Sequence, residues 1–227
     1  MDHFESIIST LLEAEHYWVR RSFKITVTKE EKVQVGKRSI PRPEIDLLAL
    51  HFSKNEAIAF EAKSFLDSPG VRLADLQKEY EIQEGRYKLF TSRTYRTFVL
   101  SKLLQNLVAH GMANSDTKVT LGLAAGKVYQ KQSEPMREFM TERGWVFWSP
   151  EDIKGKIEAL ADPKFGYQND PAIITAKILR GKINCPCRAA PDPPTSPMRC
   201  KSCRAVRRRR PRVADRRTPC RLAFQLR

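Results

Sequence analysis

The pattern of apolar residues predicts two short buried β-strands, residues 43–50 and 57–63, and both contain charged side chains. The polar segment 53–56 between them predicts a hairpin loop of about four residues. Charged side chains are rare inside buried strands unless they are paired or bound to a metal. The charges of this hairpin therefore indicate a functional site.

Centring the hairpin on its loop places Asp46 opposite Lys63 and Leu48 opposite Glu61. Residues opposite each other in an antiparallel pair share a face, as do residues two apart on one strand. Asp46, Glu61 and Lys63 are therefore expected to project from the same face. Asp46 and Glu61 become diagonal neighbours about 7–8 Å apart, a separation from which two carboxylates can bind one divalent cation.

Two carboxylates and a lysine suit metal-dependent phosphodiester hydrolysis. Mg²⁺, or Mn²⁺ in its place, prefers oxygen ligands, and the predicted ligands are Asp46, Glu61 and the backbone carbonyl of Ala62. A bound metal lowers the pKa of its water and offsets charge on the phosphate. Lys63 would help to deprotonate that water or stabilise the charge. The alternative is a half-exposed hairpin with an Asp46–Lys63 ion pair, which contributes little stability.

These strands resemble the PD-(D/E)XK nuclease superfamily, which includes type II restriction enzymes, archaeal Holliday-junction resolvases and Mrr-like restriction enzymes. Residues 44–46 (Glu-Ile-Asp) match the first acid, and residues 61–63 (Glu-Ala-Lys) match the E-x-K element. The order of helix, strand, hairpin, helix and strand is also similar, over about residues 1–150. The resemblance implies a restriction-endonuclease-like mixed sheet flanked by helices, and a Mg²⁺-dependent DNA endonuclease activity.

Two acids compete for the first position of this motif. The superfamily's proline–acid pair is Pro43-Glu44, and Asp46 lies two residues further on. Glu44 and Asp46 share a face, so strand alternation does not separate them. Asp46 is favoured because it lies further inside the strand, and because resolvase-like members have a similar Ile-Asp pair there.

The resemblance also implies a glutamate of the metal site on the first helix. An apolar stripe at helical spacing predicts a helix over about residues 3–15, and Glu5 lies along the edge of that stripe. A solvated acid in the first turn is equally compatible, because it interacts favourably with the helix dipole. Glu13 and Glu15 are interpreted as surface charges.

The rest of the chain alternates between helical and strand patterns, which indicates an α/β fold with a mixed sheet. Ser149 as N-cap, Pro150 at N1 and an acid at N3 predict the start of one helix clearly. Residues 29–42 are expected to be a charged connection. Strands are predicted over residues 17–28, 118–124 and 145–148, and helices over 71–84, 86–112, 135–143, 150–160 and 171–181.

The net charge of +15 is concentrated near the end of the chain. Residues 185–227 carry +11 of it, with twelve arginines, seven of the 14 prolines and all five cysteines. We therefore divide the chain into a nuclease-like domain, residues 1–184, and a basic tail, residues 185–227. A disordered arm that binds nucleic acid is favoured for the tail. A zinc site is an alternative, and a non-native reading frame is another.

DNA is the expected partner, because phosphate contacts supply most nucleic-acid affinity. Lys37, Arg38 and Arg42 lead into the strand of Asp46 and are the predicted phosphate contacts. A second basic group lies in the predicted helical stretch from residue 86 and comprises Arg86, Lys88, Arg93 and Arg96. The alternative for both groups is a solvated surface of mixed charge. A homodimer is a further expectation, although no segment of the sequence can be identified as a dimer interface.

No segment approaches the ~20 apolar residues of a membrane span, and the N-terminus lacks the features of a signal peptide. A cytoplasmic location is expected. The sequence has no P-loop, Cys/His dyad or glycine-rich dinucleotide turn. Two hypotheses remain: a metal-dependent deoxyribonuclease, and a non-catalytic nuclease-fold module that binds DNA or protein.

Overall fold

The computed structural model describes residues 2–34, 42–82, 84–165 and 169–181. All of them belong to the unit Met1–Asn184. The predictions for Lys37, Arg38 and the tail 185–227 therefore lie outside the described residues. No helix in the described ranges is both long enough and apolar enough to cross a membrane.

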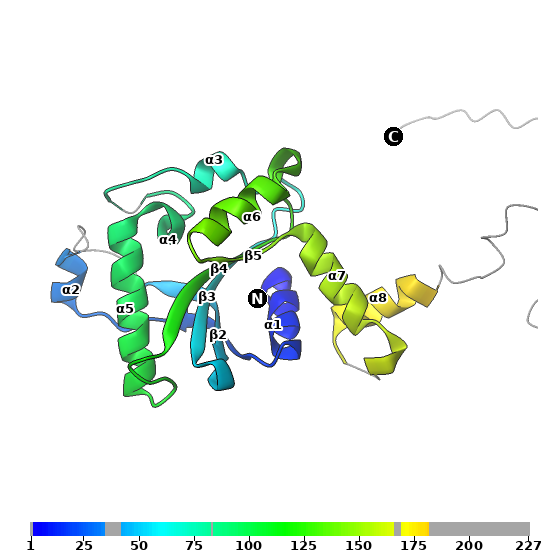
Figure 1. The fold of residues 1–227 in the computed structure, drawn as a ribbon, viewed down its shortest axis with the longest axis horizontal. Coiled ribbons are helices and arrows are strands. Elements are labelled where there is room, and N and C mark those ends of the chain that lie inside the picture. Colours follow the sequence, from blue (N-terminus) through cyan, green and yellow to red (C-terminus); the bar gives the residue numbers. More distant parts are fainter. Residues whose placement is uncertain (1, 35–41, 83, 166–168, 182–227) are drawn as a thin grey trace, which may run out of the picture. The chain divides into compact units, whose positions relative to one another are not determined.

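Over the described residues, five strands form one mixed sheet with helices on both faces, which confirms the predicted α/β class (Figure 1). The strands are β1 Trp18–Lys24, β2 Glu44–His51, β3 Glu56–Lys63, β4 Lys118–Ala125 and β5 Val146–Trp148. The helices are α1 His3–Ala14, α2 Lys29–Gln34, α3 Leu73–Leu76, α4 Lys88–Thr91, α5 Arg93–Ala109, α6 Ser133–Glu142, α7 Pro150–Leu160 and α8 Pro171–Gly181. Short 3₁₀ turns cover Phe52–Lys54, Tyr129–Lys131 and Pro163–Phe165.

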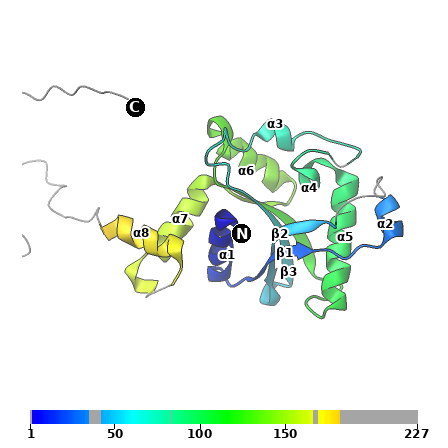
Figure 2. The same cartoon turned by 180° about the vertical axis from the view of Figure 1, so that it is seen from behind.

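The strands lie side by side in chain order, which determines where the helices pack. β1, β2 and β3 are antiparallel neighbours, and β3, β4 and β5 are parallel. Parallel strands are joined by right-handed crossovers. Because the order continues in one direction from β3 to β5, α5 and α6 both pack on the same face. α1 and α7 cover the opposite face (Figures 1 and 2).

Two buried apolar clusters fill the two interfaces of the sheet. Leu103 and Leu107 of α5 and Met140 of α6 belong to the cluster on one face. Ile8 of α1 and Ile153 of α7 belong to the cluster on the other. The sheet is therefore covered on both faces, so the charged residues of the hairpin emerge only where its strands end.

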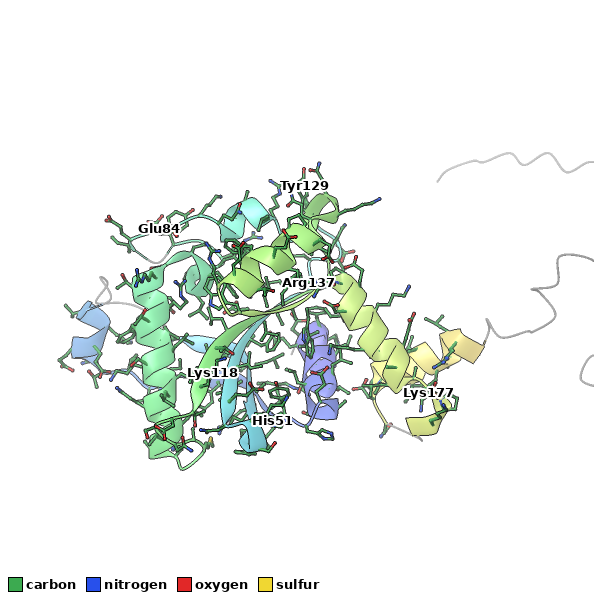
Figure 3. All side chains as sticks on the ribbon, in the orientation of Figure 1. His51, Glu84, Lys118, Tyr129, Arg137 and Lys177 are labelled. Atoms are coloured by element: carbon green, nitrogen blue, oxygen red, sulfur yellow. The ribbon has the colours of Figure 1, made fainter. Side chains whose placement is uncertain are left out.

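The start of α7 follows the prediction. Ser149 and Asp152 form a reciprocal capping box, and Pro150 stands at the first helical position. Arg137, labelled in Figure 3, donates to the Asp152 carboxylate over 2.8 Å and so connects α6 to this cap. α1 begins in a similar way, because the Asp2 side chain accepts a hydrogen bond from the Phe4 amide.

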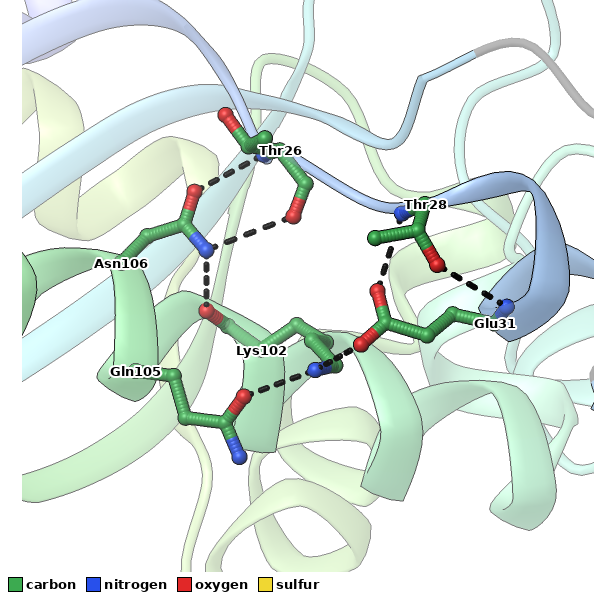
Figure 4. Close-up of polar contacts among 6 residues, drawn as sticks. All are labelled: Thr26, Thr28, Glu31, Lys102, Gln105 and Asn106. Atoms are coloured by element: carbon green, nitrogen blue, oxygen red, sulfur yellow. Dashed lines mark hydrogen bonds and ion pairs between the residues drawn. The ribbon is translucent and has the colours of Figure 1, made fainter.

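The predicted charged connection 29–42 contains the short helix α2, which the sequence analysis did not predict. Its start is a second capping box: the Thr28 amide donates to Glu31, and the Glu31 amide donates to the Thr28 hydroxyl (Figure 4). Lys102 of α5 pairs with Glu31. Asn106 of α5 accepts from the Thr26 amide over 2.8 Å. α5 therefore fixes the chain as it leaves the first strand.

Three predicted elements have the wrong limits. The strand predicted over 17–28 ends at Lys24, beyond which Thr26 bonds to α5 instead of to a strand. The helix predicted over 71–84 is reduced to Leu73–Leu76, since Val71 is held in a bridge with Val128. The helix predicted over 86–112 is two helices, because Ser92 is extended and caps the second one.

We predict that Gly122→Ala will destabilise the protein. A Cβ at Gly122 would lie 2.8 Å from the fully buried ring of Phe60, which also packs on Trp148. Overpacking of this kind costs about 1–3 kcal/mol of unfolding free energy. Urea unfolding measures the loss. Gly155→Ala is the matched control: a Cβ there meets nothing within 4 Å inside α7, so this change should stabilise by about 0.5–1 kcal/mol.

Candidate active site

The predicted hairpin is present, but its register differs from the expected one. Leu48 pairs with Ala59, not with Glu61, and Leu47 pairs with Phe60. The turn comprises residues 52–55, because Asn55 takes the left-handed conformation that asparagine tolerates. Pairing is thus shifted by two residues, which keeps the paired side chains of residues 47–51 and 56–60 on their predicted faces. Asp46 is level with Glu61 instead of opposite Lys63.

The two strands of the hairpin separate at Asp46. Their backbone pairing ends at Leu47 and Phe60. Beyond this last pair, the Ala62 amide donates to the Asp46 carboxylate over 3.0 Å. A side chain that accepts from the backbone of the neighbouring strand lies close to the plane of the sheet. Asp46 therefore meets the Ala62 amide and the Lys63 ammonium at the end of the hairpin, where the regular backbone pairing has stopped.

β1 is irregular at the same level. Its pairs with β2 include Arg21 with Leu47 and Phe23 with Ile45, with Ser22 between them at a φ of 50°. Ile45 packs with Phe23 in the cluster on the α5 face, whereas Leu47 belongs to the α1 face. Alternation along β2 is thus broken at Asp46, a distortion that strict alternation cannot predict.

Lys63 joins the two acids. Its Nζ lies 3.1 Å from Asp46 Oδ2 and 2.8 Å from Glu61 Oε2, so these two oxygens are about 6 Å apart or less. The exposed fractions of the side chains are 20% for Lys63, 23% for Asp46 and 14% for Glu61. Among the described residues, neither Asp46 Oδ1 nor Glu61 Oε1 has a hydrogen-bond donor. The acids are therefore only half satisfied by protein groups.

The charges of the site are unbalanced, since one lysine faces two acids. Burial raises the pKa of Glu61; Lys63 opposes this shift and Asp46 adds to it. Burial alone would lower the pKa of Lys63, but the charges of Glu61 and Asp46 raise it well above its usual value. Lys63 is therefore an ammonium ion at neutral pH.

A pocket of about 490 Å³ opens at this end of the hairpin, between the sheet and the α4–α5 corner. Glu61 and Lys63 line it, and it lies at the carboxyl end of β3, where α/β sheets usually bind ligands. Arg42, one of the predicted phosphate contacts, lines it too. The opposite end of the sheet carries the hairpin loop, near His51 and Lys118 in Figure 3.

Three further residues of this pocket were not assigned to the site from the sequence. Arg86 and Lys88 line it and add positive charge beside Lys63. Tyr95 lines it from the first turn of α5, and burial followed by the charge of Glu61 raises its pKa. The signal in the sequence was only a general run of basic residues, because the break at Ser92 that turns this corner was not predicted.

Glu5 lies within electrostatic reach of the site. Burial and then the charge of Asp46 raise its pKa, and Lys63 lowers it. Glu44, the competing first acid, is exposed and lines the pocket, and it makes no ion pair with Lys63. Geometry thus favours Asp46 over Glu44. Glu13 is exposed and Glu15 pairs with Lys156 of α7.

The oxygen atoms of this site are suitable ligands for Mg²⁺. Carboxylate oxygens are hard ligands, and one or two carboxylates are enough for Mg²⁺; Asp46 and Glu61 each have one oxygen that no described residue hydrogen-bonds. The Ala62 amide points toward Asp46, and a strand residue directs its amide and its carbonyl to the same side, so the Ala62 carbonyl also faces Asp46. No group of three or more His, Cys, Asp or Glu side chains within the described ranges is gathered as a metal site.

No protein-family model, curated protein or solved structure matches this chain. The candidate site therefore depends on its own geometry and on the residues at 44–46 and 61–63.

We predict that Glu61→Gln will raise the melting temperature at neutral pH. Since the pKa of Glu61 is raised by folding, its ionisation destabilises the folded state as pH rises above the ordinary value of about 4.5. The neutral amide avoids this cost and leaves Lys63 paired with Asp46. Thermal denaturation between pH 4 and 8 measures it: the gain should be largest at pH 8 and vanish toward pH 4. An equal gain in melting temperature from the exposed Glu44→Gln would contradict the assignment of the raised pKa to Glu61.

Proposed function

We propose that this protein is a Mg²⁺-dependent deoxyribonuclease that hydrolyses phosphodiester bonds at Asp46, Glu61 and Lys63. The observation that carries the proposal is the pair of mostly buried carboxylates that share one lysine and keep one oxygen each without a hydrogen-bond donor from the described residues. Such a pair attracts a divalent cation. Mn²⁺ has similar ligand preferences and is expected to substitute.

Asp46, Glu61 and the carbonyl of Ala62 would hold the metal. When bound, Mg²⁺ supplies an activated water and offsets the charge on the phosphate. Lys63, whose Nζ lies 3.1 Å from Asp46 and 2.8 Å from Glu61, would donate a hydrogen bond to a phosphate oxygen beside these acids. Its Nζ is already fixed between the two carboxylates, so it needs little reorganisation to stabilise developing charge.

DNA is the proposed substrate because the pocket beside Glu61 and Lys63 is lined by further cations. Arg42, Arg86 and Lys88 lie at its wall with Lys63, an arrangement suited to the phosphates on either side of a cleaved bond. Glu5, which is sensitive to the charge of Asp46, is proposed as an accessory member of the site. A cytoplasmic enzyme that acts as a monomer or a homodimer fits this proposal.

The second candidate is a non-catalytic nuclease-fold module that binds DNA or a protein. It is favoured by one observation: Lys63 already contacts both acids, so the three groups can serve as a structural ion-pair cluster. The two candidates differ in whether a metal binds and whether a bond is cut.

Cleavage should depend on Asp46 and Lys63. We expect Asp46→Asn and Lys63→Ala to reduce the cutting rate by at least about 10²-fold, the usual effect of losing a group that stabilises the transition state. The assay uses plasmid, linear and four-way-junction DNA with Mg²⁺, Mn²⁺ or EDTA. DNA binding and circular dichroism should remain close to wild type. Glu44→Ala is the matched control and should still cut, whereas its inactivity would move the first acid to Glu44.

Metal binding can be measured without any cleavage. We expect Mn²⁺ at a hundredfold excess over its Kd to stabilise the wild-type protein by about 2–3 kcal/mol, because the cation offsets the repulsion between Asp46 and Glu61. The readout is the melting temperature with and without Mn²⁺. Asp46→Asn should lose this shift. An identical shift in both proteins would place the metal elsewhere, and no shift in either would favour the non-catalytic candidate.

A further inference from the structure

A second pocket, of about 340 Å³, lies on the other side of the α4–α5 corner and gathers arginines. Arg93 and Arg96 line it from the first turn of α5, and Arg143 lines it from the end of α6. In the described part of the chain, no carboxylate lies within 4.0 Å of Arg93 or Arg96. Among the described carboxylates, Arg143 reaches only that of the adjacent Glu142, over 3.9 Å. These arginines are thus not explained by ion pairs.

Arg96 is held in place by neutral groups. One terminal nitrogen of its guanidinium donates to the carbonyls of Leu89 and Phe90, over 3.3 and 3.1 Å. Its plane lies 4.9 Å from the ring centre of Trp145. A guanidinium has five N–H donors, so its other N–H groups remain available. The side chain is therefore oriented before any ligand arrives, which favours Arg over Lys at such a position.

Arg143 approaches the same indole ring. It lies 3.8 Å from the ring centre of Phe139 and 5.8 Å from that of Trp145. After burial, the charge of Arg143 is the next factor that lowers the pKa of Arg96. Nearby like charges disfavour each other's charged form, so an anion bound between the two guanidinium groups would offset their repulsion.

The charge of the lining as a whole is mixed but positive. Glu79 and Glu81 line the pocket, and Lys78 lines it while paired with Asp75. One lysine and three arginines thus face two glutamates. Arginine in the first turn of a helix is also unfavourable for the helix dipole, so α5 carries its two arginines at a cost to its own stability.

The two pockets share one segment of the chain. Lys88 and Leu89 line the first pocket, whereas Phe90 and Thr91 line the second. The corner that separates them is one short helical segment, and a helix is about 10–12 Å across. A strand with its cleaved phosphate beside Lys63 that runs past this corner would therefore present a further backbone phosphate to the second pocket.

We infer that the pocket of Arg96 and Arg143 binds a backbone phosphate of the nucleic acid a few nucleotides from the bond at Lys63. This inference rests on the proposed function for the position of the strand, but the phosphate contact itself does not require cleavage. The contact is electrostatic and independent of base sequence.

Binding in EDTA tests it, with the full chain and with single-stranded and duplex oligonucleotides that carry 5′-hydroxyl or 5′-phosphate ends. Arg96→Gln and Arg143→Gln should each weaken binding about tenfold, as loss of a charge-assisted hydrogen bond does. Each should reduce the slope of log K against log salt by about 0.9 for duplex or 0.7 for single strands. Arg72→Gln is the matched control, because Arg72 stacks on Tyr129 at 4.5 Å but lines neither pocket.

Equal losses with both kinds of 5′ end would support a backbone contact. A loss confined to 5′-phosphate ends would assign the pocket to a terminal phosphate and overturn the inference, as would unchanged affinity and slope. Arg143 is exposed, so its variant remains informative if Arg96→Gln unfolds. The failure of the proposed function can be distinguished from the failure of this inference. If only the proposed function fails, binding still falls in the arginine variants, while substitution of Asp46 does not change cutting.

Discussion

The carboxylate of Asp46 is the group on which this site depends. It accepts the Ala62 amide and the Lys63 ammonium on one oxygen, at the point where β2 and β3 stop pairing through their backbones. Without a carboxylate there, the Ala62 amide would lose its partner and Lys63 would retain only Glu61. The same group thus terminates the hairpin, fixes the lysine and contributes half of the negative charge available to a cation.

The helices around the sheet shield these three side chains from most of the solvent. α5 and α6 cover one face of the sheet because the parallel strands follow one direction, and α1 and α7 cover the other. Burial is what raises the pKa of Glu61, while α1 brings Glu5 within reach of Asp46. The covering helices thus determine the electrostatics of a site whose three main groups all come from one hairpin.

The fold class and the central groups could be predicted from the sequence, because alternation and charge are local signals. Asp46, Glu61 and Lys63 do meet, since a shift of two residues leaves all three at the same end of the hairpin. The route by which they meet could not be predicted. It depends on the left-handed Asn55, the irregular Ser22 and a side chain that replaces a backbone acceptor. Arg86, Lys88 and Tyr95 were missed as site residues because their convergence requires the corner at Ser92, a tertiary feature.

The position of the hairpin turn bears on how this protein can vary between species. Residues 52–55 lie at the end of the sheet away from Asp46, so substitutions there leave the charged groups untouched. Pairing that slips by two residues keeps each side chain on its face, whereas a slip by one exchanges the faces. Changes in this turn are therefore constrained by parity: a change in pairing by an even number of residues leaves the core residues on their faces, whereas a change by an odd number exchanges the faces.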